Sequence, residues 1–156
     1  MLKRAGHKTE GYPFRGVAGD MSFLPFVDEC FDKVVSMTVL EFVADGRGAV
    51  ADLFRVTRKG GVVVVTTLNS LSPWAARRKK AAAKGHSLFE RMIFRSPDEL
   101  RALAPVEGLV KTAIHCQKDD DPAKAAGIEH DGQRRDLDTG AFLAARWEKP
   151  VTQIED

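Results

Sequence analysis

The sequence predicts an α/β fold built on a mostly parallel sheet. The valine-rich run Val34–Met37 is typical of a strand that is covered on both faces, and Val62–Thr67 is the strongest strand signal in the sequence. Between them, apolar residues recur at helical spacing, and the pattern stops at Gly60-Gly61, where glycine can end a helix. A strand, a helix and a strand in this order form a βαβ unit, whose parallel strands end at the same rim of the sheet.

The first half of the chain supplies this unit and the segments that lead to it. We expect a helix tail over residues 1–8, then a short strand around Val17-Ala18 that ends at Gly19-Asp20. The βαβ unit follows, with its first strand over Phe31–Thr38 and its helix from Ala49 to the glycine pair. The continuous hydrophobicity of its first strand predicts burial on both faces.

The second half adds two helices and two strands. The alanine-rich, strongly basic segment over residues 75–84 is a helix candidate, and Ser96-Pro97-Asp98-Glu99 combines an N-cap, a proline at the first helical position and a capping-box glutamate. Residues 109–116 and 141–147 are predicted as two late strands. The polar stretch over residues 117–140 is expected to form a mobile loop between them.

Composition and charge fit one ordinary domain. The 156 residues are 44% hydrophobic and 29% charged, and the 24 Lys and Arg nearly balance the 22 Asp and Glu, so nothing points strongly to nucleic acid as a partner. Cys30 and Cys116 lack metal-ligand spacing and His86, His115 and His130 are scattered, so no metal site is predicted. Without an apolar leader or a membrane-length apolar run, we expect a cytoplasmic protein that spans no membrane.

Short motifs lie before and within the βαβ unit in a fixed order along the chain. They are Gly19-Asp20, Leu24-Pro25-Phe26, Phe31-Asp32, the valine-rich strand, Val39-Leu40-Glu41-Phe42-Val43, Phe54-Arg55-Val56 and Gly60-Gly61. This series resembles the class I S-adenosylmethionine-dependent methyltransferases, in particular the small-molecule type 11 group, although Lys59 stands where that family usually has proline. The resemblance implies a Rossmann-like sheet with helices on both faces, mostly parallel with a reversed last strand, and S-adenosylmethionine as cofactor.

The resemblance assigns four residues to the cofactor. Asp20 is expected to accept a hydrogen bond from the adenine amine, with Met21 packed against the ring, and Ser36 and Met37 are expected near the methionine part. The residues alone also allow Asp20 to be a turn residue that binds its own backbone. In the same way, Ser36 and Met37 are equally consistent with a strand end in the core.

Glu41, Asn69 and Trp74 are the candidates for the substrate side, where the resemblance places them. A solvated or helix-capping Glu41 and a merely packed Trp74 are the alternatives. The run Arg77-Arg78-Lys79-Lys80 with Lys84 suits an acidic substrate, a membrane surface or RNA, but also a plain solvated helix face. No catalytic residue is assigned, because a sulfonium methyl group is already activated and positioning does most of the work.

In this family, a glycine-rich loop that holds the methionine end of the cofactor and an acidic residue that holds its ribose precede these motifs. Neither feature is found in the sequence ahead of the first expected strand. We therefore expect an N-terminally truncated methyltransferase domain over residues 1–148, without the first two strands and that loop, and a tail over residues 149–156. The sheet would then have an exposed edge, suited to self-association or to a partner chain.

The predicted function is S-adenosylmethionine-dependent methyl transfer to a small-molecule acceptor that the sequence does not identify. One alternative is a catalytically inactive methyltransferase remnant that acts as a binding or scaffold subunit. Another is a nucleotide-binding reductase of similar topology. The two late strands and their polar connection favour the methyltransferase over the reductase, because they resemble the reversed hairpin that closes a methyltransferase sheet.

Overall fold

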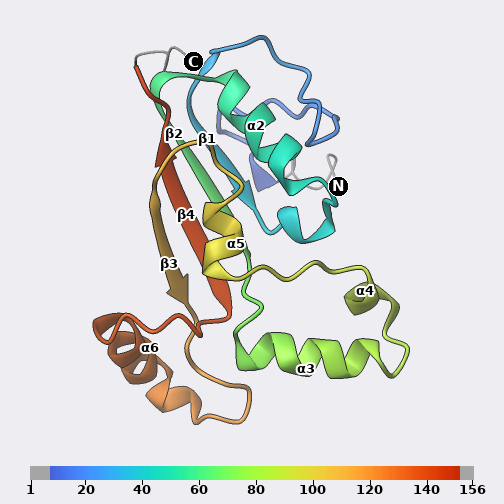
Figure 1. Cartoon of the computed structure of the whole chain (residues 1–156), viewed down its shortest axis with the longest axis vertical. Coiled ribbons are helices and arrows are strands. Elements are labelled where there is room, and N and C mark those ends of the chain that lie inside the picture. Colours follow the sequence, from blue (N-terminus) through green and yellow to red (C-terminus); the bar gives the residue numbers. More distant parts are fainter. Residues whose placement is uncertain (1–7, 152–156) are drawn as a thin grey trace.

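A computed structural model gives the fold of residues 8–151 (Figure 1). The helix tail predicted over residues 1–8 therefore lies almost wholly outside the described residues. Within the described range, four strands form one mixed sheet in the order β1-β2-β4-β3. No helix in this range is both long and apolar enough to cross a membrane.

The predicted βαβ unit is present. β1 (Phe31–Met37) pairs in parallel with β2 (Thr57–Leu68), and α2 (Gly46–Val56) connects them after a short 3-10 helix, η1 (Leu40–Phe42). Both strands therefore end at the same rim of the sheet, as the sequence indicated.

The end of α2 differs from the prediction. The helix stops at Val56 rather than at the glycine pair, because Thr57 already has the extended backbone of β2, with ψ of 133°. Gly60 lies inside β2 with a positive φ of 70°, where the pairing of β1 with β2 shifts register. The glycine therefore permits an irregularity in a strand, a conformation that other residues rarely adopt.

The two late strands are confirmed and give the sheet its reversed member. β4 (Phe142–Glu148) is antiparallel to both β2 and β3 (Leu109–Ala113), between which it lies. The predicted mostly parallel sheet with a reversed last strand is thus present, although only the β1 and β2 pairing is parallel.

The middle helices follow their sequence signals. α3 (Pro73–Ala82) is the basic helix, and α4 (Ser87–Glu90) is a single turn after it. The third, α5 (Pro97–Arg101), has the predicted capping box: Ser96 Oγ accepts from the Glu99 N–H at 3.2 Å, and the Glu99 carboxylate accepts from the Ser96 N–H at 2.6 Å.

The polar stretch over residues 117–140 was predicted as a mobile loop, and this prediction is wrong. It holds a 3-10 helix, η2 (Pro122–Lys124), and α6 (Ala125–Arg134). The Glu129 carboxylate accepts from the His115 N–H at 2.8 Å, which ties α6 to the end of β3. Tertiary contacts of this kind, rather than an apolar stripe, stabilise α6, so hydrophobic periodicity does not reveal it.

The strand predicted around Val17-Ala18 is not formed. Residues 13–19 pair with no strand in the described part of the chain, and only Asp20 makes an isolated antiparallel bridge to Phe23. An extended segment without a neighbour leaves its backbone groups to water and does not become a strand.

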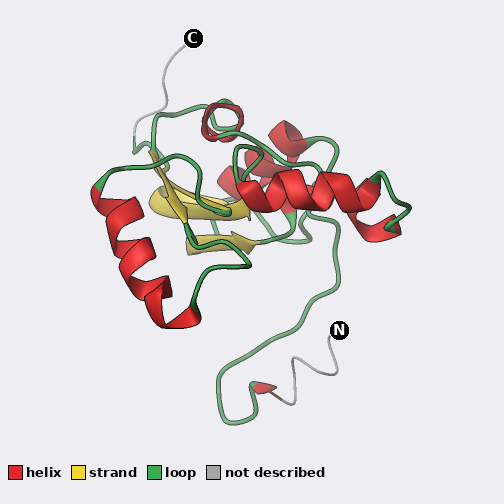
Figure 2. Cartoon of the chain, turned by 90° about the horizontal axis from the view of Figure 1, so that it is seen from below, coloured by secondary structure: helices red, strands yellow, loops and turns green. Residues whose placement is uncertain are grey.

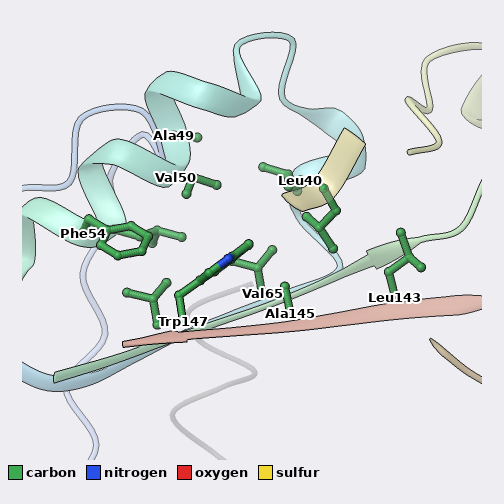
Figure 3. Close-up of a cluster of buried hydrophobic side chains, with 11 residues drawn as sticks. Leu40, Ala49, Val50, Phe54, Val65, Leu143, Ala145 and Trp147 are labelled. Carbon is green, nitrogen blue, oxygen red and sulfur yellow. The ribbon is translucent and has the colours of Figure 1, made fainter. Parts of the chain in front are cut away.

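One face of the sheet packs against α2 and η1 to form the core (Figure 3). Val50 and Phe54 of α2 and Leu40 of η1 lie above Val65 of β2 and Trp147 of β4. Burial of this size supplies the main favourable free energy of folding, at roughly 1.5 to 3 kcal/mol for each large apolar side chain.

The opposite face is less covered than predicted. On β1, Val35 is 59% exposed and Met37 is 65% exposed, so this strand is not buried on both faces. The reason is that β1 is an edge strand and that most described helices lie on one side of the strands (Figure 2). Among the described residues, helical cover of both faces is therefore incomplete.

Candidate functional site

The rim at which β1 and β2 end, which we call the carboxyl rim, gathers several irregular segments. Thr38 leads from β1 into η1, and Asn69 leads from β2 toward α3 (Figure 1). β3 runs in the same direction as β2, since both are antiparallel to β4, so the segment after Ala113 also begins there. Ligands of open α/β sheets bind at this rim.

Thr38 marks the rim with an unusual backbone. Its φ of 49° lies in the left-handed region, which a β-branched residue rarely adopts. Its N–H donates to the Thr66 carbonyl at 3.0 Å, so the turn out of β1 is fixed against β2. Strained residues of this kind persist where the surroundings hold them, and they gather at binding sites.

Three of the four predicted cofactor residues come together near the end of β1. The Ser36 Oγ lies 3.9 Å from the Met21 Sδ, and both side chains face the core side of the sheet. Asp20 is exposed beside Met21, and its Oδ1 accepts from the Ser22 N–H at 2.8 Å. This is the turn bond that the sequence allowed, and it leaves the second carboxylate oxygen of Asp20 without a partner in the described chain.

Met37 is separated from this group. Successive residues of a strand point to opposite faces, so Met37 faces the exposed side of the sheet while Ser36 faces the core. The structure therefore brings Asp20, Met21 and Ser36 to one side and places Met37 on the other.

Arg55 of α2 holds the segment that contains these residues. Its Nη1 donates to the Phe26 carbonyl at 2.8 Å and its Nη2 to the Leu24 carbonyl at 3.0 Å. Ion pairs to Asp52 at 2.6 Å and to Asp28 at 2.8 Å complete the set. Sequence reasoning treated Arg55 only as part of a motif, although its spacing of three from Asp52 was a signal for a helix-surface pair.

Arg55 and its carboxylate partners Asp52 and Asp28, which we call the Arg55 clamp, stabilise one another's charged forms. The hydrogen bond from Arg55 is the main cause that lowers the pKa of Asp52, against a smaller opposing effect of burial. The Leu24 N–H adds to the lowering by donating to Asp52 Oδ2 at 2.7 Å. In turn, Asp52 and Asp28 raise the pKa of Arg55.

Glu41 is buried at the carboxyl rim rather than solvated. One of its carboxylate oxygens accepts from the Thr67 Oγ1 at 3.3 Å, and its backbone carbonyl accepts from the Ile93 N–H at 2.8 Å. The carboxylate therefore lies inside the rim, between η1 and the end of β2.

Arg95 is the rim residue that sequence reasoning missed. It is 6% exposed, and it donates from Nη1 to the Leu40 carbonyl at 2.7 Å and from Nη2 to the Val43 carbonyl at 3.0 Å. Burial lowers its pKa, and the nearby carboxylates of Glu99 and Glu41 oppose this. No local pattern distinguishes this arginine, because its partners are backbone carbonyls far away in the sequence.

Asn69 serves the rim as an anchor between loops. Its Nδ2 donates to the Asp138 carbonyl at 2.6 Å and to the Gly140 carbonyl at 2.8 Å, while its Oδ1 accepts from the Leu71 N–H at 3.0 Å. Both amide donors are therefore used within the protein, which leaves this side chain little capacity for a substrate.

Trp74, in contrast, borders open space. A hollow of about 280 Å³, which we call the α3 hollow, lies between α3 and the segment after β3. Its lining includes Trp74, Arg77 and Lys80 of α3 together with Lys118 and Asp119. Trp74, one of the three predicted substrate-side residues, therefore lines a hollow at the carboxyl rim.

Among the described residues, no three His, Cys, Asp or Glu side chains lie together in a way that could hold a metal ion. The candidate site is therefore made of backbone turns, one exposed carboxylate, buried polar groups and a basic hollow.

Comparisons with known proteins agree on one family. Residues 1–65 match the family model of the methyltransferase domain. The chain is 30% identical over 118 aligned residues to demethylmenaquinone methyltransferase from Thermobifida fusca, covering 64% of this chain and 50% of that protein. It is 28% identical over 119 residues to malonyl-[acyl-carrier protein] O-methyltransferase from Serratia marcescens, covering 62% and 47%. The chain thus spans about half the length of these curated relatives.

A solved structure confirms the predicted fold. The crystal structure of an S-adenosylmethionine-dependent methyltransferase from Thermotoga maritima superposes with a TM-score of 0.70 at 21% identity, covering 94% of this chain and 70% of that one. The Rossmann-like arrangement inferred from the motifs is therefore present.

Proposed function

We propose that the chain is part of a class I S-adenosylmethionine-dependent methyltransferase and takes part in methyl transfer to a small-molecule acceptor, a proposal that the family match over residues 1–65 and the shared fold support. The observation that carries the proposal is the grouping of Asp20, Met21 and Ser36 at the carboxyl rim, next to the strained Thr38. S-adenosylmethionine is the cofactor of this family; Asp20 and Met21 are suited to its adenine end, and Ser36 is proposed to lie near its methionine part.

The side chains fit such a ligand by their chemistry. Asp20 keeps one carboxylate oxygen for a neutral amine donor while the other holds the turn, and Met21 offers a soft apolar surface beside it. Arg55 fixes the segment that carries both residues, so the contacts are preorganised rather than formed on binding.

When bound, S-adenosylmethionine supplies a methyl group that is already activated on a sulfonium. The task left for this chain is positioning: the Asp20 segment orients the adenine, and η1 with the buried Glu41 shapes the rim where the acceptor approaches. Trp74 and the α3 hollow then border the acceptor from the side of β2.

Calorimetry with S-adenosylhomocysteine tests the proposal. We expect the chain to bind it, and to gain thermal stability because the ligand binds only the folded state. Asp20→Asn should weaken binding about fivefold to tenfold, since a charge-assisted hydrogen bond of roughly 1 kcal/mol is lost while the turn acceptor remains. The matched control is Asp98→Asn, which makes the same change at an exposed carboxylate on α5, outside this segment, and should leave the affinity unchanged.

A chain that does not bind S-adenosylhomocysteine would contradict this proposal and favour a binding or scaffold subunit. A specific observation supports that second function: Val35 and Met37 of the edge strand β1 are exposed on the open face. Light scattering separates the two cases, because a partner-binding edge should give self-association that Val35→Lys abolishes.

A further inference from the structure

We propose that the α3 hollow binds the anionic group of the acceptor, a phosphate or carboxylate attached to an apolar or planar body. This inference rests on the proposed function, because it gives the acceptor of that same site a chemical class. The hollow lies at the carboxyl rim, since α3 follows the end of β2 and the opposing segment follows the end of β3 (Figure 1).

The first support is an excess of positive charge. Arg77, Lys80 and Lys118 line the hollow against a single carboxylate, that of Asp119. The described residues form nine ion pairs in total, and none of them includes a basic side chain of α3 or Lys118. Three cations beside one carboxylate leave a net positive charge in the hollow, and a bound anion reduces the repulsion between the cations.

The second support is a fixed aromatic wall. The Trp74 Nε1 donates to the Cys116 carbonyl at 2.8 Å, and the Arg78 guanidinium lies 5.8 Å from the centre of the ring. These contacts hold the indole in one orientation before any ligand arrives. A solvated basic helix face has no need of such a wall, whereas a ligand with an apolar body does.

The spacing of residues on α3 places the cations and the indole on the same face of the helix. Trp74, Arg77 and Lys80 recur at every third residue, so they lie on one face of the helix, the face turned toward Lys118. The ligand that matches is therefore amphiphilic, with its anionic end among the cations and its body on the indole.

The available space suits such a molecule. A second hollow of about 620 Å³ shares Pro73 and Gln117 with the α3 hollow and extends along α6. A head group among the cations therefore leaves room for the rest of a small acceptor, whose usual pocket is several hundred Å³.

Fluorescence titration of the full chain with phenyl phosphate tests the inference. The chain has two tryptophans, and Trp147 is only 1% exposed, so a change in emission on binding reports on Trp74. The double variant Arg77→Gln with Lys80→Gln removes two lining cations. The matched control, Lys79→Gln with Lys84→Gln, removes the same charge from residues that do not line the hollow.

We expect saturable binding of phenyl phosphate, weakened by roughly tenfold in the lining variant and by less than about twofold in the control. Inorganic phosphate should bind more weakly than phenyl phosphate because it lacks the ring, and neutral phenol should not saturate. The far-ultraviolet circular dichroism of both variants should match the parent, because all four substitutions are on exposed side chains.

Three results would overturn the inference. They are absence of saturation by phenyl phosphate, equal weakening in the lining and control variants, and binding only to phosphatidylglycerol vesicles or RNA. Calorimetry with S-adenosylhomocysteine on the same samples keeps the two proposals apart. Cofactor binding without phenyl phosphate binding would overturn the hollow alone, whereas the reverse would overturn the proposed function and leave the hollow as an anion site.

Discussion

Two arginines each hold one segment of the candidate site: Arg55 holds the segment over residues 20–28 near the solvent, and Arg95 holds η1 in the interior. Arg55 binds the carbonyls of Leu24 and Phe26 near the solvent, with Asp52 and Asp28 as ion-pair partners. Its side chain is one-third exposed, so water and salt screen part of these interactions.

Arg95 performs the same task in the interior. It binds the carbonyls of Leu40 and Val43, and among the described residues it forms no ion pair. The Leu40 carbonyl also accepts from the Val43 N–H at 3.2 Å, whereas Arg95 is the donor that the structure gives the Val43 carbonyl, which loses water when this side chain covers it. The comparison teaches that the η1 segment is held by a buried side chain that water does not reach, whereas the segment over residues 20–28 is held by contacts that water and salt partly screen.

The largest effect is expected from Arg95→Ala. The substitution removes two charge-assisted hydrogen bonds, leaves the Val43 carbonyl without a donor and the Leu40 carbonyl with only the Val43 N–H, and opens a space in the rim, so the free energy of unfolding should fall by about 3 kcal/mol. Urea denaturation at neutral pH measures this. Arg95→Lys is the control, because it keeps the charge but not both hydrogen bonds, and it should retain part of the stability. A loss below about 1 kcal/mol for the alanine variant would remove the distinction between the two clamps.

A smaller, pH-dependent effect is expected from Asp52→Asn. The Asp52 side chain is only 12% exposed, and its loss of charge should cost about 1 kcal/mol at neutral pH. Because the folded protein lowers the pKa of Asp52 below its usual 3.8, the stabilisation is present above that value and is lost as the pH falls through the folded pKa. Urea midpoints of the parent and variant should therefore converge in acid. A difference that persists at low pH would mean that packing, not charge, holds the segment.

The smallest effect is expected from Asp28→Asn. The Asp28 side chain is 74% exposed, so the change should shift the stability by less than about 0.5 kcal/mol, and high salt should remove even this. Thermal melts at low and high salt provide the measurement. Arg101 and Asp98 form a comparably exposed pair, so Asp98→Asn should behave alike. A clear loss of stability for Asp28→Asn but not for Asp98→Asn would show that the Arg55 clamp depends on Asp28 as well as on Asp52.

Local signals predicted most of the fold. The βαβ unit and the capping box at Ser96 each follow from residues that lie close together in the sequence, whereas the reversed direction of β4 was predicted from the family resemblance. The two wrong predictions of secondary structure instead depend on contacts between segments. α6 is stabilised through Glu129 and His115, and Val17 lacks a strand only because no described neighbour pairs with it. Neither fact is written in the hydrophobic pattern.

The candidate site was less predictable than the fold. The motifs brought Asp20, Met21 and Ser36 forward, and the structure places them together. Met37 followed from the same motif, but the alternation of the strand directs it to the opposite face. Arg95 had no signal at all, because a buried arginine that binds carbonyls looks the same in a sequence as one on the surface.

The place of β4 in the sheet has a consequence for the order of assembly. β3 is made before β4, and among the strands that the structure describes it pairs with β4 alone, which in turn pairs with β2. During synthesis, β1, α2 and β2 can therefore associate as soon as they emerge, while β3 has no partner until residues 142–148 have left the ribosome. The last strand acts as the closing member of the sheet, and a chain interrupted before it would lose two strands rather than one.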